Sequence, residues 1–230
     1  MKGKNDYTPL VFAADMGRVD CCKKLVVFGA DVQVRIRGLS VLHLNAANGH
    51  LDCLKYFIDQ GKKHAKFIQN THIFKGLDAK LLDDKNQSPI FYAARNGHND
   101  VVSLLISRPG VSCTLHTLQP YSPFQAQVDA EGKTPLHYAA EAGLLDTCKL
   151  LIKEISANVK DNAGHTPLYM AASKGSLRVV SFLLEHKASQ LDESLKASVQ
   201  FPPVALALIR AGADTKFLLG IPSFPAPSLS

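Results

Sequence analysis

Apolar and polar positions along the chain recur in short blocks with helical spacing. The block "GKTPLHYAAEAG" at 132–143 has near-copies at 8–17, 40–49, 88–97 and 166–175. Each copy opens with a Thr or Ser that can cap a helix, and all but the second place Pro at the first helical position. Small Ala-Ala pairs let two helices approach closely, and the closing Gly can adopt the left-handed conformation that ends a helix. The pattern predicts five short helices.

A second apolar segment follows each block. Its apolar side chains recur at helical spacing, so each copy is predicted to be a helix-turn-helix with one apolar side. Two short helices cannot shield that side alone, and the copies are therefore expected to stack into a solenoid. The apolar positions of the second helices are Leu25 and Val26; Leu54, Phe57 and Ile58; Val101, Val102, Leu105 and Ile106; Leu150, Leu151 and Ile152; and Val179, Val180, Leu183 and Leu184.

The blocks, together with "GADV" at 29–32, resemble the ankyrin repeat, which has a T-P-L-H-x-A signature and a period of about 33 residues. The resemblance implies an all-α ankyrin-repeat solenoid with β-hairpin tips between the helix pairs. The segment 191–216 lacks T-P-L but repeats the second-helix pattern, which predicts a degenerate C-terminal cap. The Pro-rich tail 217–230 cannot continue a helix. Residues 1–216 are thus interpreted as one array, with five full repeats at about 3–34, 35–61, 83–107, 129–160 and 161–190.

The spacing of the closing glycines predicts two insertions. Successive glycines lie 32, 48, 46 and 32 residues apart, so extra residues fall at about 62–82 and about 108–127. The first insertion has apolar spacing that permits another helix, and the second is expected to be an ordered loop. Insertions in solenoids often decorate a binding face. Four aromatic side chains there are candidate partner contacts, with packing on the flank of the array as the alternative: Phe67, Phe74, Tyr121 and Phe124.

Composition and charge indicate where the chain is located and which classes of partner it could bind. Its longest wholly apolar run is 202–209, far shorter than the roughly 18 residues that suggest a membrane span. With no signal-peptide pattern at the start, we expect no membrane span and a cytoplasmic, or else nuclear, location. The net charge of +6 lies in residues 1–75, which hold 12 Lys and Arg against 6 acids. Such an excess of basic residues would favour binding to an acidic protein, an anionic membrane surface or nucleic acid. No basic run exceeds two residues, so solvated lysines are the alternative and nucleic-acid binding is not expected.

The cysteines follow the repeat pattern. Five cysteines without a C-x-x-C pair suggest neither a disulfide framework nor a zinc site. Cys21 and Cys53 share the slot that holds Val elsewhere, and Cys22 and Cys148 share the next slot. All four are expected to be core residues, because free cysteine behaves as a small hydrophobe.

The histidines also recur in register. His43 and His137 share one repeat position, and His50 and His98 share another. The resemblance implies that His in T-P-L-H ties turn and helices together by hydrogen bonds. Without a catalytic constellation, the chain is predicted to be no enzyme and to need no cofactor or metal. The alternative is an enzyme or metal protein that uses residues of the insertions: Cys113, His64, His72 and His116.

The resemblance implies binding of another protein in a concave groove formed by the hairpin tips and the first helices. A stripe with one residue from each repeat is predicted to line it: Phe12, Leu44, Tyr92, Tyr138 and Met170. Flanking and tip candidates are Asp15, Met16, Arg37, Asn48, Arg95, Asn96, Glu141 and Lys174. The function expected is a non-catalytic adaptor, monomeric when alone. A constitutive subunit of a large assembly is the alternative, and the stripe residues could instead pack on neighbouring helices.

Overall fold

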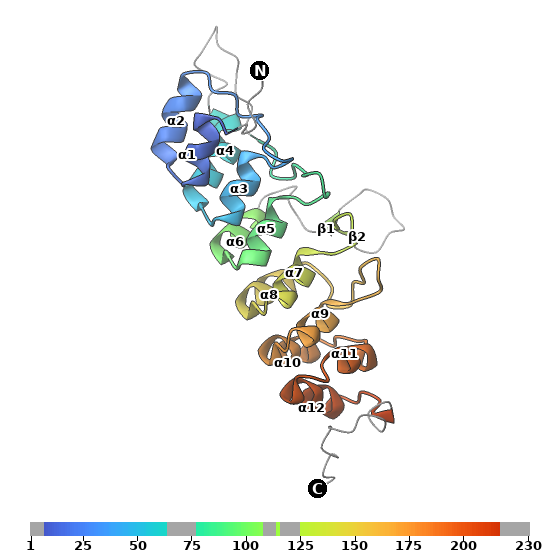
Figure 1. Ribbon diagram of the computed structural model, residues 1–230. Coiled ribbons are helices and arrows are strands. Elements are labelled where there is room, and N and C mark those ends of the chain that lie inside the picture. Colours follow the sequence, from blue (N-terminus) through green and yellow to red (C-terminus); the bar gives the residue numbers. More distant parts are fainter. Residues whose placement is uncertain (1–6, 64–76, 108–113, 116–124, 217–230) are drawn as a thin grey trace.

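The computed structural model describes residues 7–63, 77–107, 114–115 and 125–216 (Figure 1). Within them, the helices follow one another in six pairs. The first helices of the pairs are α1 (Pro9–Asp15), α3 (Val41–Ala47), α5 (Pro89–Asn96), α7 (Pro135–Glu141), α9 (Pro167–Ser173) and α11 (Leu191–Ala197). The second helices are α2 (Val19–Val27), α4 (Leu51–Lys63), α6 (Asn99–Ser107), α8 (Leu145–Leu151), α10 (Leu177–Glu185) and α12 (Pro202–Arg210).

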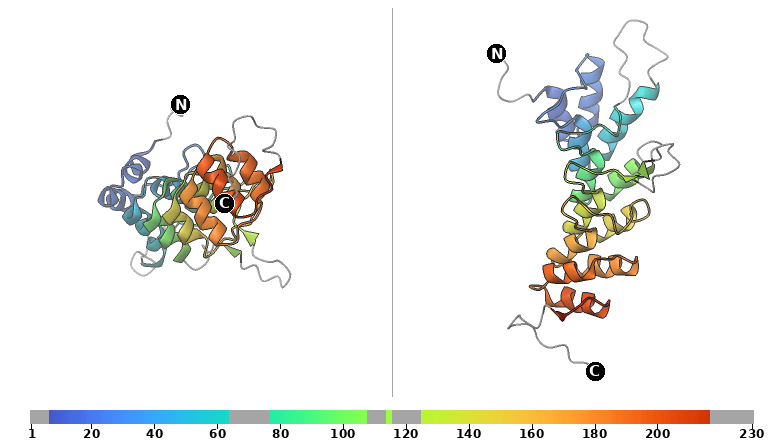
Figure 2. Two further views of the ribbon diagram at one scale, coloured as in Figure 1. Left: turned by 90° about the horizontal axis from the view of Figure 1, so that it is seen from below. Right: turned by 90° about the vertical axis from the view of Figure 1, so that its right-hand side faces the viewer.

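The pairs stack along one axis into an elongated molecule (Figure 2). Each first helix contacts the first helix of the next pair, and each second helix contacts the next second helix. Two layers of helices result, and the buried apolar side chains lie between them and between successive pairs. The predicted all-α solenoid is confirmed.

The first helices begin as the sequence predicts in most copies. The Thr8 side chain accepts a hydrogen bond from the Val11 N–H, and Thr166 accepts one from Tyr169. Ser40 and Thr134 form capping boxes in which a histidine completes the pair. Ser88 departs from the prediction because its hydroxyl donates to Gln127 Oε1 at 2.9 Å instead of capping α5.

The closing glycines have the predicted left-handed backbone, with φ between +66° and +75°. Stacking adds a second constraint. A Cβ built on Gly49 would lie 2.5 Å from Nδ1 of His98 in the next repeat, so the packing leaves no space for a side chain. A Cβ built on Gly17 would likewise lie 2.6 Å from Nδ1 of His50 in the next repeat. These positions therefore need glycine both for conformation and for close approach.

The turns that precede the first helices are tight and are closed by aspartate side chains. Asp129 Oδ1 accepts the N–H groups of Glu131 and Lys133, both at 2.9 Å. Asp161 Oδ1 accepts those of Ala163 and His165 in the same geometry. In the turn before α3, Ile36 and Leu39 form an isolated antiparallel bridge.

The described parts of the two predicted insertions return to the array. Leu77 and Ala79 are buried, and the Leu77 N–H donates to the Phe57 carbonyl at 3.0 Å. The rest of the first insertion, including the segment where another helix was considered, lies outside the described residues. In the second insertion, β1 (Thr114–Leu115) pairs with β2 (Gln125–Ala126) in antiparallel register. No helix in the described part of the chain is long and apolar enough to cross a membrane.

Candidate interaction surface

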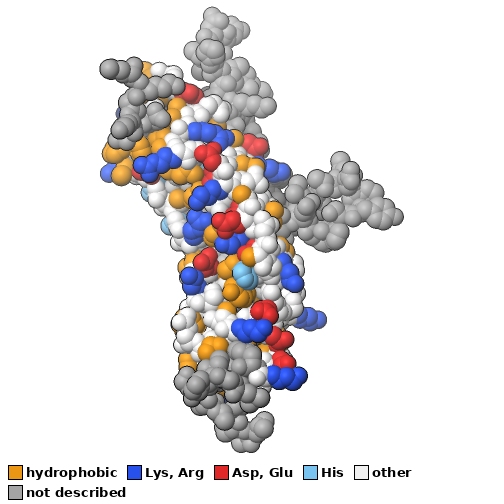
Figure 3. Space-filling view, turned by 45° about the vertical axis from the view of Figure 1, so that its right-hand side comes forward, with side chains coloured by type: hydrophobic (Ala, Val, Ile, Leu, Met, Phe, Trp, Pro, Cys, Tyr) orange, Lys and Arg blue, Asp and Glu red, His pale blue; other side chains and the backbone are white. Residues whose placement is uncertain are grey.

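We call the surface formed by the first helices and the turns before them the inner face. Figure 3 brings the turn side of the molecule forward and shows basic and acidic side chains alternating along its length. Hydrophobic side chains gather at its upper end, over the first repeat. Each repeat contributes the same positions to this face, so side chains from equivalent positions form rows along the stack.

Two buried histidines hold the turns to the inner helices, as the resemblance implied. The Thr134 N–H donates to His137 Nδ1 at 3.0 Å, and Nε2 lies 3.1 Å from the His165 carbonyl. Because a backbone N–H only donates, Nδ1 is the acceptor and Nε2 carries the proton that binds the carbonyl. His43 makes the same contacts with Ser40 and Gln87. Burial lowers the pKa of both imidazoles, which favours their neutral form.

Tyr138, predicted to line the groove, is almost entirely buried. Only 8% of it is exposed, and its hydroxyl donates to Asp129 Oδ2 at 2.7 Å. Its ring packs edge to face on Phe91 of the preceding repeat, with the ring centroids 6.1 Å apart. Burial, together with the hydrogen bond to Asp129, raises the pKa of the Tyr138 hydroxyl. Tyr138 therefore joins two repeats and is not available as a partner anchor.

The other residues of the stripe are buried to different extents. Met170 is 7% exposed, so little of its surface is left for contact with a partner. Tyr92 and Leu44 are partly buried, and Tyr92 packs edge to face on His43 with ring centroids 5.6 Å apart. Phe12 has no described repeat before it and is 58% exposed. For Tyr138 the structure supports the alternative of packing on a neighbouring helix, and Met170 is part of the buried core.

The candidates flanking the stripe do lie on the surface, at the ends of the first helices. They are linked from repeat to repeat: Asn48 Nδ2 donates to Asp15 Oδ1 at 2.9 Å, and Lys174 Nζ lies 3.6 Å from Glu141 Oε1. Asn96 Nδ2 donates to the Ala47 carbonyl at 2.7 Å. Exposed candidates in this group are Met16, Arg37, Asn48, Asn96 and Lys174, whereas Asp15, Arg95 and Glu141 are partly buried.

Aspartates at the turns are residues that the sequence analysis missed. Asp83 Oδ2 accepts the Tyr92 hydroxyl, and Asp129 Oδ2 accepts both the Tyr138 hydroxyl and Gln87 Nε2. Burial opposes ionisation of Asp83, but the hydrogen bonds from Tyr92 and two backbone N–H groups lower its pKa. A signal was present in the sequence: an Asp stands five residues before the capping Ser or Thr in three repeats, at 83, 129 and 161.

The four cysteines that the structure describes divide into a buried set and one exposed residue. Cys22, Cys53 and Cys148 are buried as predicted, and burial raises the pKa of the Cys148 thiol to about 12. Cys21 is exposed, which contradicts its prediction as a core residue. Its counterpart Cys53 packs beneath the preceding repeat, but no described repeat precedes Cys21.

The other candidates lie outside the described residues. These are the aromatic residues Phe67, Phe74, Tyr121 and Phe124, and the alternative metal or catalytic set Cys113, His64, His72 and His116. Among the residues that the structure does describe, no group of three or more His, Cys, Asp or Glu side chains is arranged to hold a metal ion.

The first repeat exposes several large apolar side chains. Phe12 and Met16 lie at its inner helix, and Val27 and Phe28, at the end of α2, are 82% and 86% exposed. Later repeats have polar residues such as Lys153 and Glu154, or Glu185 and His186, at the positions of Val27 and Phe28. Exposure of apolar side chains at the end of α2 is therefore a feature of the local sequence of this repeat.

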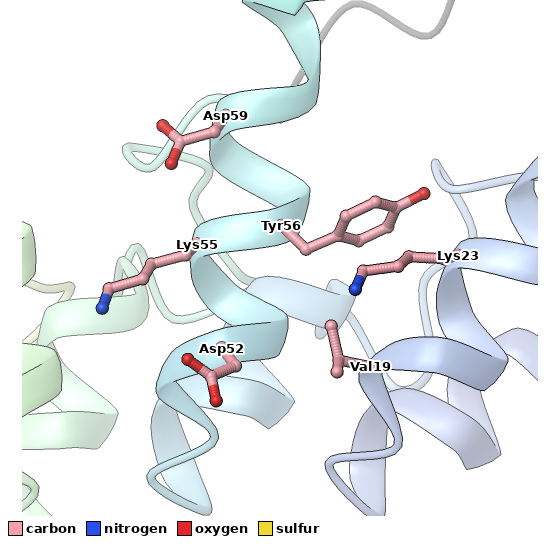
Figure 4. A pocket seen from close by; sticks show the side chains of 6 residues that line it. All are labelled: Val19, Lys23, Asp52, Lys55, Tyr56 and Asp59. Carbon is pink, nitrogen blue, oxygen red and sulfur yellow. The ribbon is translucent and has the colours of Figure 1, made fainter.

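A hollow of about 360 Å³ lies between α2 and α4, on the side of the second helices (Figure 4). Val19, Lys23 and Tyr56 lie between the two helices, whereas Asp52 and Lys55 point to the other side of α4. Because charged groups of both signs line it without converging, we assign it no ligand.

Comparison with known proteins agrees with this architecture. The family model described as "Ankyrin repeats (3 copies)" matches residues 1–70, 62–161 and 110–194, which together span most of the chain. This chain belongs to the ankyrin-repeat family. The human ASB11 ankyrin repeat domain shares its fold with a TM-score of 0.68, at 24% sequence identity and over 91% of this chain and 86% of that one.

Sequence relatives match this chain over part of their own length. The ankyrin-repeat chain is 28% identical over 112 residues to the putative E3 ubiquitin-protein ligase XBAT31 of Arabidopsis thaliana, covering 48% of this chain and 24% of that protein. It is 31% identical over 131 residues to human palmitoyltransferase ZDHHC13, covering 56% and 17%. The target of rapamycin complex 2 subunit AVO2 of Saccharomyces cerevisiae is 26% identical over 162 residues, covering 69% and 32%. The chain thus spans a third or less of each relative.

Proposed function

We propose that this ankyrin-repeat chain is a non-catalytic adaptor that binds another protein through its inner face, turn tips and insertions. Ankyrin-repeat domains generally mediate protein–protein interaction and are typically not catalytic. The observation that supports the inner face is the row of mixed polar side chains at the helix ends, one set from each repeat. The repeat fold does not dictate these residues, so they are free to encode specificity. Fold alone does not identify a partner.

The apolar and polar candidates have different roles in this proposal. Met16 and Phe12 are exposed at one end of the face and would supply buried apolar area on binding. Asn48, Asn96 and Lys174 would supply polar contacts along the rest. The chain is monomeric alone in this proposal, acts in the cytoplasm or nucleus, and does not bind nucleic acid.

Capture of partners from a native lysate, followed by substitution, tests the proposal. Met16→Glu with Lys174→Glu places acidic groups at both ends of the inner face. The matched control is Lys149→Glu with Arg178→Glu, on the exposed side of the second helices. We expect the inner-face variant to lose the partner and the control to keep it, with equal thermal stability for both. Loss of the partner only in the control would place binding on the second helices and contradict the proposal.

A second candidate is a constitutive subunit of a large assembly. The exposed apolar side chains of the first repeat favour it, since large apolar surfaces rimmed by polar residues mark contacts between proteins. A native-size measurement separates the candidates: a permanent subunit elutes only with its assembly, whereas an adaptor is also found alone.

A further inference from the structure

Arg95 is held in a fixed orientation on the inner face by the two tyrosines of the stripe. Its guanidinium carbon lies 4.1 Å from the ring centroid of Tyr138 and 5.7 Å from that of Tyr92. Both tyrosines are themselves fixed, because their hydroxyls donate to turn aspartates. Rings anchored in this way hold a cation over their faces by electrostatic attraction. The guanidinium is thus positioned before any partner arrives.

A buried amide also sets the direction of the guanidinium. Gln87 Nε2 donates to Asp129 Oδ2 at 2.7 Å and to the Tyr138 hydroxyl oxygen at 2.9 Å. This arrangement fixes the amide, so its oxygen faces Arg95 and accepts a hydrogen bond from Nη2 at 3.4 Å. A guanidinium carries five N–H donors, and this contact uses only one of them.

The other charged side chains at the ends of the first helices have partners. Lys174 lies beside Glu141, and Asp15 accepts hydrogen bonds from Asn48. Lys133, which also approaches the Tyr138 ring, pairs with Glu131 at 2.8 Å. In the described part of the chain, no Asp or Glu forms an ion pair with Arg95. Its contacts there are two aromatic rings and one neutral amide, which leave its charge unpaired.

We propose that Arg95 is the specificity-determining anchor of the inner face and binds the carboxylate of an Asp or Glu side chain in an acidic peptide segment of the partner. A planar guanidinium with free, parallel N–H groups matches a carboxylate in two-point geometry. A carboxylate suits the site better than a phosphate, because the two tyrosines that flank Arg95 are bonded to the carboxylates of Asp83 and Asp129, whose negative charges disfavour a doubly charged ligand more than a singly charged one. The inference rests on the proposed binding function and names the partner's chemistry.

Random linear peptides displayed on phage provide the probe. The full chain is used for selection, and binding of each selected peptide is measured by fluorescence anisotropy. We expect the selected peptides to share one Asp or Glu. Changing that residue to Asn or Gln should weaken binding to the native chain by about tenfold or more, the usual effect of losing a charge-assisted hydrogen bond. The same peptide change should have little effect on Arg95→Gln, because the group it pairs with is gone.

Arg178→Gln is the matched control, since it removes the same charge from the exposed side of the second helices and should leave the affinity of the selected peptides unchanged. The peptide substitution keeps the test valid even if Arg95→Gln folds poorly. The inference would be overturned if the selected peptides lacked an acidic residue or if the selection yielded no peptide. It would also be overturned if a peptide with phosphoserine in place of the acidic residue bound more tightly. If peptide affinity is unchanged by Arg95→Gln but lost in the Met16→Glu, Lys174→Glu variant, the inference about Arg95 fails and the proposed function stands. If neither variant changes peptide affinity, both the inference about Arg95 and the proposed binding through the inner face are contradicted.

Discussion

Residues at equivalent repeat positions have different roles in different copies. Tyr92 and Tyr138 each reach a turn aspartate, but Met170 cannot because it lacks a hydroxyl, and Phe12 has no described repeat before it. The histidines of the T-P-L-H position are more uniform. His43 and His137 both accept a hydrogen bond at Nδ1 and donate one from Nε2, and this pattern requires the neutral ring.

Because of these two histidines, the free energy of unfolding should fall as pH falls. Their folded-state pKa values lie below the ordinary 6.5, so the unfolded chain takes up protons first. Their contribution is complete above about pH 6.5 and is lost as pH falls toward the folded values, at up to about 1.4 kcal/mol per histidine per pH unit. Urea unfolding at a series of pH values measures the slope. His137→Gln should reduce it, whereas Gln in place of the exposed His186 should not; equal slopes in all three proteins would contradict this assignment.

The residue that closes the first helix of a repeat must lack a bulky side chain and must also adopt a left-handed backbone. The sequence predicted the backbone conformation of the closing glycines. It did not predict that the next repeat places a ring against Gly17 and Gly49, because this contact arises only when repeats stack. His98 is held against Gly49 by a hydrogen bond from Nε2 to the Ala47 carbonyl at 2.8 Å, so it cannot move without losing that bond.

Replacing Gly49 with Ala should therefore destabilise the chain more than replacing Gly29 with Ala. Both glycines have positive φ, +72° and +85°, which costs a non-Gly residue about 1–2 kcal/mol. A Cβ at Gly29 meets nothing within 4 Å, whereas at Gly49 it overlaps His98. The overlap should add about 1–3 kcal/mol, as is typical of overpacking. Urea unfolding of both variants measures the difference, and equal losses of stability would show that the contact with His98 is unimportant.

Across the described part of the molecule, the main helix contacts run between neighbouring repeats, and the first described repeat has a described neighbour on one side. Phe12 and Cys21 are exposed there, although their counterparts Tyr138 and Cys53 are buried. In a solenoid, stability is roughly a sum of repeat and interface terms, so a repeat with one interface opens more readily than one with two.

Thiol labelling should reveal this gradient. In a Cys113→Ser background, we expect a maleimide reagent to modify Cys21 in the folded chain and to leave Cys22, Cys53 and Cys148 unmodified. At intermediate urea concentrations, Cys22 should react before Cys148, because the repeat of α2 has one described neighbour whereas that of α8 has two. Peptide mass spectrometry identifies each site. Simultaneous reaction of these two thiols would indicate a single cooperative unit instead.

The sequence by itself determined the helix pairs, their caps and closing glycines, and the stacked all-α architecture, because these depend on local conformation and on a repeated apolar pattern. Only the tertiary structure decided which side chains remain on the surface. Burial of Tyr138 and Met170, and exposure of Cys21, depend on whether a preceding repeat covers the position, which no single repeat encodes. The unpaired charge of Arg95 likewise emerges only when two tyrosines and a glutamine from adjacent repeats come together around it.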